Sequence, residues 1–159
     1  MNIVVCTTPR SGSNWFRDEL VLRGYPECSE WFHPGQPIYS DQLIPRIKQA
    51  RLEDKDFGVK LFPEHVQKNG DSIYDLLEMI DNEPNIYIRL LRSNLREQAM
   101  SWSGSRRQQS WFESTQKYSS NNEKEVINFR DRIHADNKWW DRRLRDKDYF
   151  LVRYEEMKE

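Results

Sequence analysis

The stretch that decides the fold is Asn2-Ile-Val-Val-Cys-Thr-Thr-Pro-Arg-Ser-Gly-Ser-Asn-Trp15. Its first part, residues 2–7, is a short run rich in β-branched side chains, which predicts a buried strand. Pro9 and Gly12 end this strand and predict a tight turn. Residues 14–23 then have the apolar spacing of a helix, and Gly24 follows as a stop signal. The stretch therefore predicts a strand, a turn and a helix in immediate succession.

The same alternation continues along the chain. Strands are predicted at residues 57–62 (FGVKLF), 85–91 (NIYIRLL) and 149–153 (YFLVR), and helices at 41–51, 72–80, 94–109 and 123–146. The last helix has one apolar stripe, interrupted by Asn137 and formed by Val126, Phe129, Ile133, Trp140 and Leu144. Strands that alternate with helices favour a parallel sheet with right-handed crossovers. We expect a single α/β domain over residues 1–159, with a central parallel sheet flanked by helices in three layers.

Composition argues against several classes of protein. The 159 residues include 25 Lys+Arg and 26 Asp+Glu, a formal net charge of -1, so a wholly basic nucleic-acid binder is disfavoured and any anion site must be local. Aromatic residues make up 13% of the chain, which argues against disorder. Cys6 and Cys28 have no metal-ligand spacing, and no apolar run approaches the roughly 18 residues that span a bilayer. We expect a cytoplasmic protein without a membrane span, a nucleic-acid partner or a metal.

The turn at residues 7–15 has the features of a phosphate-binding loop. A strand that breaks into a turn and opens a helix leaves backbone N–H groups pointing at one spot, where the helix dipole adds positive potential. Ser11 and Ser13 supply hydroxyls, Gly12 allows close backbone approach and Arg10 supplies a cation. The loop is not a Walker A motif, because Ser13 stands at the position of its lysine, so an ATP kinase is the weaker interpretation. An ordinary Ser or Asn helix cap is the alternative.

A second anion site is predicted where residues 85–91 end. Arg92 follows this strand, and Asn94 with Glu97 three residues later predicts a capping box at the start of the next helix. Ser101 lies seven residues after Asn94, about two helical turns, and so returns to the face on which the helix began. Arg92 and Ser101 can therefore contact one phosphate from two sides. In isolation this signal is weak, and Arg92 and Ser101 are better interpreted as ordinary helix-surface residues.

Together these motifs resemble those of sulfotransferases that use 3′-phosphoadenosine 5′-phosphosulfate (PAPS). PRSGSNW (9–15) is similar to the 5′-phosphosulfate loop of that family. LLRSNLREQAMSW (90–102) is similar to its 3′-phosphate motif, in the form found in bacterial trehalose-type enzymes. YFLVRYEEM (149–157) resembles a late strand of the family followed by Tyr-Glu-[DE]-[LM]. The resemblance implies a P-loop-NTPase-like fold and transfer of a sulfuryl group from PAPS to a hydroxyl of a carbohydrate or glycolipid-like acceptor.

The resemblance also implies individual roles. The 5′-phosphosulfate would be held by Arg10, Ser11, Gly12, Ser13 and Asn14. Trp15 would lie near the adenine, although by itself Trp15 is equally a core residue. Arg92 and Ser101 would bind the 3′-phosphate, and adenosine 3′,5′-bisphosphate would be the product. Glu97 stands where the family usually has a basic or apolar residue.

Sulfuryl transfer to an alcohol needs a base for the hydroxyl proton and positive charge beside the departing phosphate oxygen, and it does not inherently require a metal. Arg10 and Lys60 are the candidate cations, with an exposed strand-end lysine as the alternative for Lys60. Glu30 is the first choice of base, because its aromatic neighbours in CSEWFHP (28–34) favour partial desolvation and the resemblance agrees. His33 and His65 are rival bases, and a solvated carboxylate is the alternative for Glu30.

The acceptor side is less specific. Basic and aromatic side chains alternate after the second motif and predict either an acceptor groove or a solvated amphipathic helix: Trp102, Arg106, Arg107, Trp111, Phe112, Lys117 and Tyr118. Relatives usually continue with further helices, so we expect this member to lack the usual C-terminal extension, which leaves a homodimer open. Two other functions remain open: a catalytically degenerate member that binds a nucleotide or a partner, and an atypical P-loop nucleotide kinase.

Overall fold

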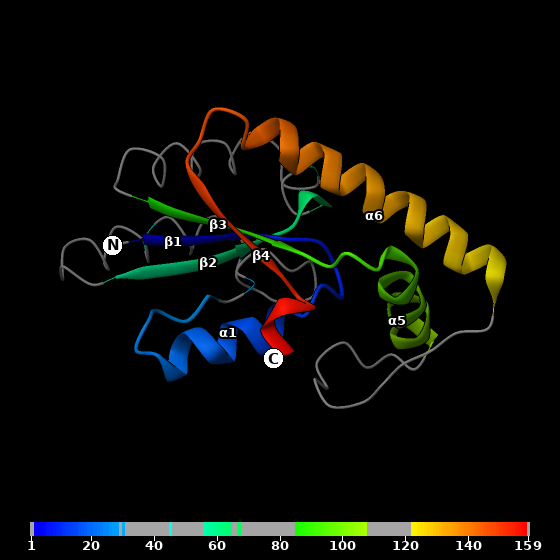
Figure 1. Cartoon of the computed structure of the whole chain (residues 1–159), viewed down its shortest axis with the longest axis horizontal. Helices are drawn as coiled ribbons and strands as arrows, with labels where there is room; N and C mark the ends of the chain where they lie inside the picture. The colour runs from blue at the N-terminus through cyan, green and yellow to red at the C-terminus, as the bar shows by residue number, and fades with distance from the viewer. Residues whose placement is uncertain are drawn as a thin grey trace.

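The structure is a computed structural model that describes residues 2–28, 30, 45, 56–64, 67, 85–107 and 122–158. Four strands in these ranges form one sheet: β1 (Asn2–Cys6), β2 (Phe57–Leu61), β3 (Asn85–Leu91) and β4 (Tyr149–Arg153). All three pairings are parallel, and the order β2-β1-β3-β4 places β1 and β3 in the middle (Figure 1). The predicted α/β class and parallel sheet are confirmed, and each strand ends within one residue of its prediction.

Helices pack on both faces of this sheet. α1 (Ser13–Leu22) lies on one face, where Leu20 packs with Val5 and Ile88. α6 (Glu123–Arg143) lies on the other face, where Asn137 contacts Arg89, the residue after Ile88 (Figure 1). Neighbouring residues of a strand point to opposite faces, so these contacts place α1 and α6 on opposite sides. β1 is buried along its whole length because both of its faces are covered.

The predicted apolar stripe of α6 is confirmed, since all five of its members are buried. α5 (Leu95–Arg107) packs against this stripe, and the Trp102 and Phe129 ring centroids lie 4.6 Å apart. The interruption at Asn137 has a structural reason. Arg89 on β3 is 1% exposed, and its Nη2 donates a hydrogen bond to Asn137 Oδ1 at 2.7 Å. A buried guanidinium needs such a polar partner, which an apolar side chain would not provide.

The predicted helix ends are less accurate than the predicted strands. α1 begins at Ser13, one residue early, and α6 ends at Arg143 rather than at residue 146. After Arg143 the backbone tightens into turns in which Arg145 N–H donates to the Arg142 carbonyl and Lys147 N–H to the Leu144 carbonyl. The predicted helices at 41–51 and 72–80 lie outside the described residues, apart from Pro45, which is helical. Among the described helices, none combines the length and the apolar character needed to cross a bilayer.

Candidate functional site

The loop between β1 and α1 has the backbone of an anion-binding turn. Arg10 at φ 60° and Gly12 at φ 89° are both left-handed, which turns the chain sharply from the strand into the helix. Gly12 is the N-cap of α1, and no side chain makes a capping hydrogen bond there. The alternative prediction of an ordinary Ser or Asn cap is therefore wrong, because the N-cap residue is Gly12, which has no side chain to accept a hydrogen bond.

Buried side chains form hydrogen bonds that hold the β1–α1 loop in its conformation. Thr7, Thr8 and Ser11 are fully buried. The Thr7 and Ser11 hydroxyls bond to each other at 2.5 Å, so the Ser11 side chain fixes the loop. From α5, Gln98 Nε2 donates to Thr8 Oγ1 at 2.8 Å and to the Pro9 carbonyl at 2.6 Å. From α6, Trp140 Nε1 donates to the Thr7 carbonyl at 2.8 Å. The loop conformation is thus imposed by two helices from distant parts of the sequence.

The second predicted motif lies at the junction of β3 and α5. Asn94 Oδ1 accepts a hydrogen bond from Glu97 N at 3.1 Å, which confirms the predicted cap. The reciprocal half of the predicted capping box is wrong. The Glu97 carboxylate pairs instead with Arg92 Nη2 at 2.9 Å, and the Asn94 N–H donates to Glu155 Oε1 at 3.2 Å. Because Arg92 and Glu155 offer better partners, Glu97 does not bond back to Asn94.

The two predicted anion motifs meet at the carboxyl ends of neighbouring strands. Arg10 Nε donates to Ser101 Oγ at 3.0 Å, across 91 residues of sequence. Arg92 Nη1 lies 3.5 Å from the Arg10 carbonyl oxygen. The Nε atom of Arg92 is buried and has no hydrogen-bond partner among the residues that the structure describes. Open α/β sheets bind ligands at this edge, and the cluster of Arg10, Arg92 and Ser101 provides convergent donors for an anion there.

A third predicted residue joins the site from β2. Lys60 pairs with Val5 of β1 in the sheet, and its Nζ lies 2.7 Å from Asn14 Oδ1 and 2.8 Å from Glu30 Oε1. The side chains of Lys60 and Glu30 are 1% and 23% exposed, so the alternatives of an exposed lysine and a solvated carboxylate are both wrong. Burial lowers the pKa of Lys60 from its ordinary value, and the negative charge of Glu30 opposes that shift. The rival bases His33 and His65 lie outside the described residues.

Two residues that the sequence did not single out also contact the site. The Tyr154 ring centroid lies 4.8 Å from the Arg92 guanidinium, and a side chain added at Gly12 would overlap this ring. The Glu155 carboxylate accepts from Ser93 N at 3.0 and 3.1 Å. Burial acts to raise the pKa of Glu155, but the backbone hydrogen bonds outweigh it and the pKa is lowered. In the sequence, the motif Tyr-Glu-Glu-Met contributed to the family resemblance but gave no function for Tyr154 or Glu155. Their contacts with Arg92, Gly12 and Ser93 become visible only in the folded structure.

The remaining predictions separate into two groups. Trp15 is 41% exposed, so its alternative assignment to the core is wrong and it remains free to face a ligand. Trp102 is 3% exposed and packs on Phe129, which contradicts its predicted place in an acceptor groove, because α6 covers it. Arg106 is exposed. No side-chain placement is described for Arg107, and Trp111, Phe112, Lys117 and Tyr118 lie outside the described residues.

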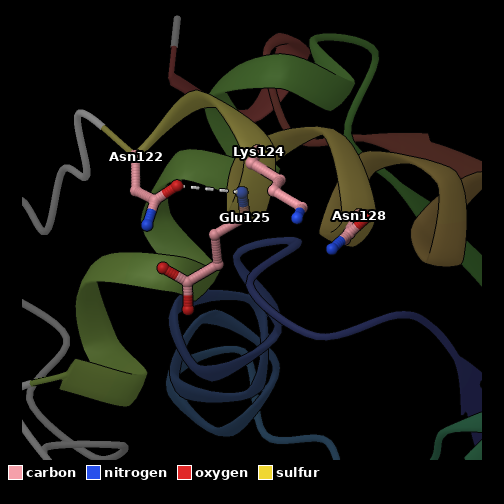
Figure 2. A pocket seen from close by; sticks show the side chains of 4 residues that line it. All are labelled: Asn122, Lys124, Glu125 and Asn128. Carbon is pink, nitrogen blue, oxygen red and sulfur yellow. Dashed lines mark hydrogen bonds between the residues drawn. The ribbon is translucent and has the colours of Figure 1, made fainter.

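A separate hollow of about 370 Å³ lies at the start of α6 (Figure 2), lined by Asn122, Lys124, Glu125 and Asn128. The side chains of two of these residues, Asn122 and Glu125, already bond within the protein. Asn122 Oδ1 accepts from Glu125 N at 3.2 Å, and the Glu125 carboxylate accepts from Ser103 Oγ at 2.7 Å. None of the predicted anion-binding residues lines this hollow. We therefore place the candidate site at the β1–α1 loop.

Comparison of the chain with models of known families, with curated proteins and with solved structures returned no match. The function must therefore be inferred from the residues and their geometry. The strongest geometric features are a left-handed loop that opens a helix and the cluster of Arg10, Arg92 and Ser101 beside it.

Proposed function

We propose that this protein is a PAPS-dependent sulfotransferase with a P-loop-NTPase-like fold. The observation that carries the proposal is the contact of Arg10 with both Ser101 and Arg92. These residues were selected from two separate motifs, one for the 5′-phosphosulfate and one for the 3′-phosphate of the same nucleotide. Their meeting at one edge of the sheet supports a single ligand with two anionic groups.

The donor would lie along this edge. Its 5′-phosphosulfate would accept hydrogen bonds from backbone N–H groups at the start of α1, where residues 11–14 turn into the helix. Its 3′-phosphate would contact Arg92 and Ser101. Trp15, in the first turn of α1 and 41% exposed, offers an aromatic surface for the adenine.

Glu30 and Lys60 would serve the transfer step. Glu30 takes the proton of the acceptor hydroxyl while the hydroxyl oxygen forms a bond to sulfur. The bond from sulfur to the bridging phosphate oxygen breaks with its electron pair, giving a sulfate ester, adenosine 3′,5′-bisphosphate and protonated Glu30. Lys60 and Arg10 would stabilise the negative charge that develops on the departing oxygen. No metal is needed for this proton and charge balance.

The class of acceptor and the compartment complete the proposal. The resemblance to trehalose-type enzymes favours a small molecule or carbohydrate that carries a hydroxyl. Cys6 and Cys28 are both buried and are not joined in a disulfide, which fits a reducing compartment such as the cytoplasm.

Calorimetry with adenosine 3′,5′-bisphosphate tests donor binding. The wild-type protein should bind it, and Arg10→Ala and Arg92→Ala should each weaken binding about tenfold or more, because each removes a charge-assisted hydrogen bond. Arg96→Ala is the matched control, since Arg96 is on the same helix as Ser101 and pairs with Glu123 outside the site. A wild-type protein that does not bind at millimolar ligand would overturn the proposal.

Transfer of labelled sulfate from PAPS to a panel of hydroxyl acceptors tests the activity itself. Transfer supports the enzyme. Tight donor binding with no transfer to any acceptor would instead favour the catalytically degenerate member, and turnover of Mg-ATP would favour the nucleotide kinase.

A further inference from the structure

The guanidinium of Arg92 pairs with one carboxylate, and a second carboxylate bonds to the backbone that follows Arg92. Glu97 pairs with its Nη2 atom at 2.9 Å, and Glu155 bonds to the backbone of Ser93, the next residue. An anion that enters this cluster therefore meets an arginine that already has an internal counter-ion.

The two carboxylates are held very differently. Glu155 accepts from two backbone N–H groups, that of Ser93, which is shared between both carboxylate oxygens, and that of Asn94. Glu97 holds Arg92 through one ion-pair contact, and its side chain is 61% exposed. The glutamate end of this pair is exposed while Arg92 is 14% exposed, so water solvates the Glu97 carboxylate well once another anion takes its place on Arg92. Glu97 is thus the carboxylate that an incoming anion displaces.

The geometry around Arg92 also sets the direction from which an anion approaches. The Tyr154 ring lies against the guanidinium, with its centroid 4.8 Å away. Phosphates bind a guanidinium in its plane through paired N–H donors. Glu97 takes one N–H of Nη2, whereas within the described part of the chain the buried Nε has no hydrogen-bond partner and Nη1 lies 3.5 Å from the Arg10 carbonyl oxygen. A phosphate that takes the Nη2 N–H now directed at Glu97 must replace the Glu97 carboxylate.

We propose that Glu97 is an internal competitor for the 3′-phosphate of the nucleotide. It neutralises Arg92 in the empty site, is displaced when the phosphate binds, and returns when the nucleotide leaves. This inference rests on the proposed function and adds a specificity-determining residue to it. Glu97 lowers the affinity for nucleotides that carry a 3′-phosphate and leaves the binding of nucleotides without one unchanged.

The test compares two nucleotides on one variant. Glu97→Gln keeps the shape of the side chain and removes its charge. Calorimetry at low salt should show an affinity for adenosine 3′,5′-bisphosphate about three- to tenfold higher than wild type, the range expected when a weak exposed competitor is lost. The affinity for adenosine 5′-monophosphate should stay the same, because that ligand has no group to displace Glu97.

Glu123→Gln is a closely matched control. Glu123 pairs with Arg96 at 2.9 Å and its side chain is 60% exposed, so the substitution removes the same charge from an ion pair of the same length. It should change the affinity for neither nucleotide. An equal rise in Glu123→Gln would show a general effect of net charge and would overturn the inference.

The inference and the proposed function fail in distinguishable ways. If the wild-type protein binds adenosine 3′,5′-bisphosphate and Glu97→Gln binds it equally well or more weakly, Glu97 does not compete, and the inference alone is overturned. If Glu97→Gln raises the affinity for both nucleotides equally, the charge of Glu97 acts independently of the 3′-phosphate, and the inference alone is again overturned. A wild-type protein that binds neither nucleotide overturns the proposed function and the inference with it.

Discussion

Lys60 and Glu30 form an ion pair with 2.8 Å between Nζ and Oε1, in which the lysine side chain is 1% exposed and the glutamate side chain 23%. The same Nζ lies 2.7 Å from Asn14 Oδ1 in the first turn of α1. One buried ammonium therefore joins the proposed donor loop to the proposed base. A buried charge is stable only when it is paired, so each partner depends on the other.

Glu30→Gln should abolish sulfuryl transfer and leave the binding of adenosine 3′,5′-bisphosphate within about threefold of wild type. The amide cannot take the acceptor proton, but its oxygen can still accept a hydrogen bond from Lys60, so Lys60 continues to hold the donor loop through Asn14. Labelled-sulfate transfer and calorimetry measure the two effects. Glu27→Gln, an exposed position nearby, should retain transfer. An active Glu30→Gln variant would move the role of base to His33 or His65.

Gly12→Ala should destabilise the fold by about 2–4 kcal/mol and weaken nucleotide binding. Alanine at φ 89° is strained, and its Cβ would overlap the Tyr154 ring. Gly24→Ala is the control. Gly24 has φ 81° and no atom lies within 4 Å of an added Cβ, so alanine there introduces backbone strain but no steric overlap. Urea denaturation gives the free energy of unfolding of both variants. The difference between their losses measures the cost of the overlap with the Tyr154 ring. Equal losses at the two glycines would show that Tyr154 moves away freely.

Trp140→Phe should destabilise the protein by about 2–3 kcal/mol. Trp140 is 1% exposed, and its Nε1 donates to the Thr7 carbonyl at 2.8 Å, so phenylalanine leaves a small cavity and a buried carbonyl without its partner. Chemical denaturation measures the loss. Trp139→Phe changes the neighbouring, half-buried residue and should cost less than half as much. Comparable losses of stability in Trp140→Phe and Trp139→Phe would show that the hydrogen bond from Trp140 to the Thr7 carbonyl contributes little.

Asp136→Asn should stabilise the protein at neutral pH. Burial raises the pKa of Asp136 to about 6, Arg132 and Arg89 oppose the shift, and Glu64 adds to it. The folded protein thus holds this proton more tightly than the unfolded chain, so wild-type stability falls as pH rises from about 4 to about 6 and stays lower above that range. A full conversion of the shift gives about 3 kcal/mol, and partial exposure of the carboxyl reduces this to about 1 kcal/mol.

Urea denaturation at several pH values tests this effect. Asp136→Asn should exceed wild type by about 1 kcal/mol above pH 7 and match it below pH 4. Asp131→Asn removes the same charge from the exposed side of α6, where the carboxylate is 65% exposed, and should show no such pH-dependent difference. A gain for Asp136→Asn that is the same at every pH would contradict an origin in the raised pKa.

Much of the fold was predictable because its signals are local. Period-two and period-3.6 patterns arise within a few residues, so the alternation of strands and helices and the apolar stripe of α6 could be derived from the sequence. The exact helix ends could not, because the last turns adjust to their neighbours. Trp102 illustrates the same limit: its sequence surroundings are basic and aromatic, yet α6 covers it and leaves it 3% exposed.

The site was predictable in its parts and not in its connections. The sequence could identify four of the site residues, because each lies near the end of a predicted strand, in the turn after it or in the following helix: Arg10, Lys60, Arg92 and Ser101. The partner of each depends on the sheet order, which brings β1 beside both β2 and β3. Glu97 shows the consequence, since the sequence pattern predicts a capping box and the fold offers it Arg92 instead.

By itself, the sequence determined an α/β chain with two strand-to-helix turns suited to anions. Only the tertiary structure decided that Arg10 contacts Ser101, that Lys60 joins Asn14 to Glu30, and that Tyr154 covers Gly12. The physical reason is the sequence separation over which each interaction acts. Backbone propensity and side-chain periodicity act between residues a few positions apart, whereas these contacts form only after parallel pairing brings the carboxyl ends of separate strands to one edge.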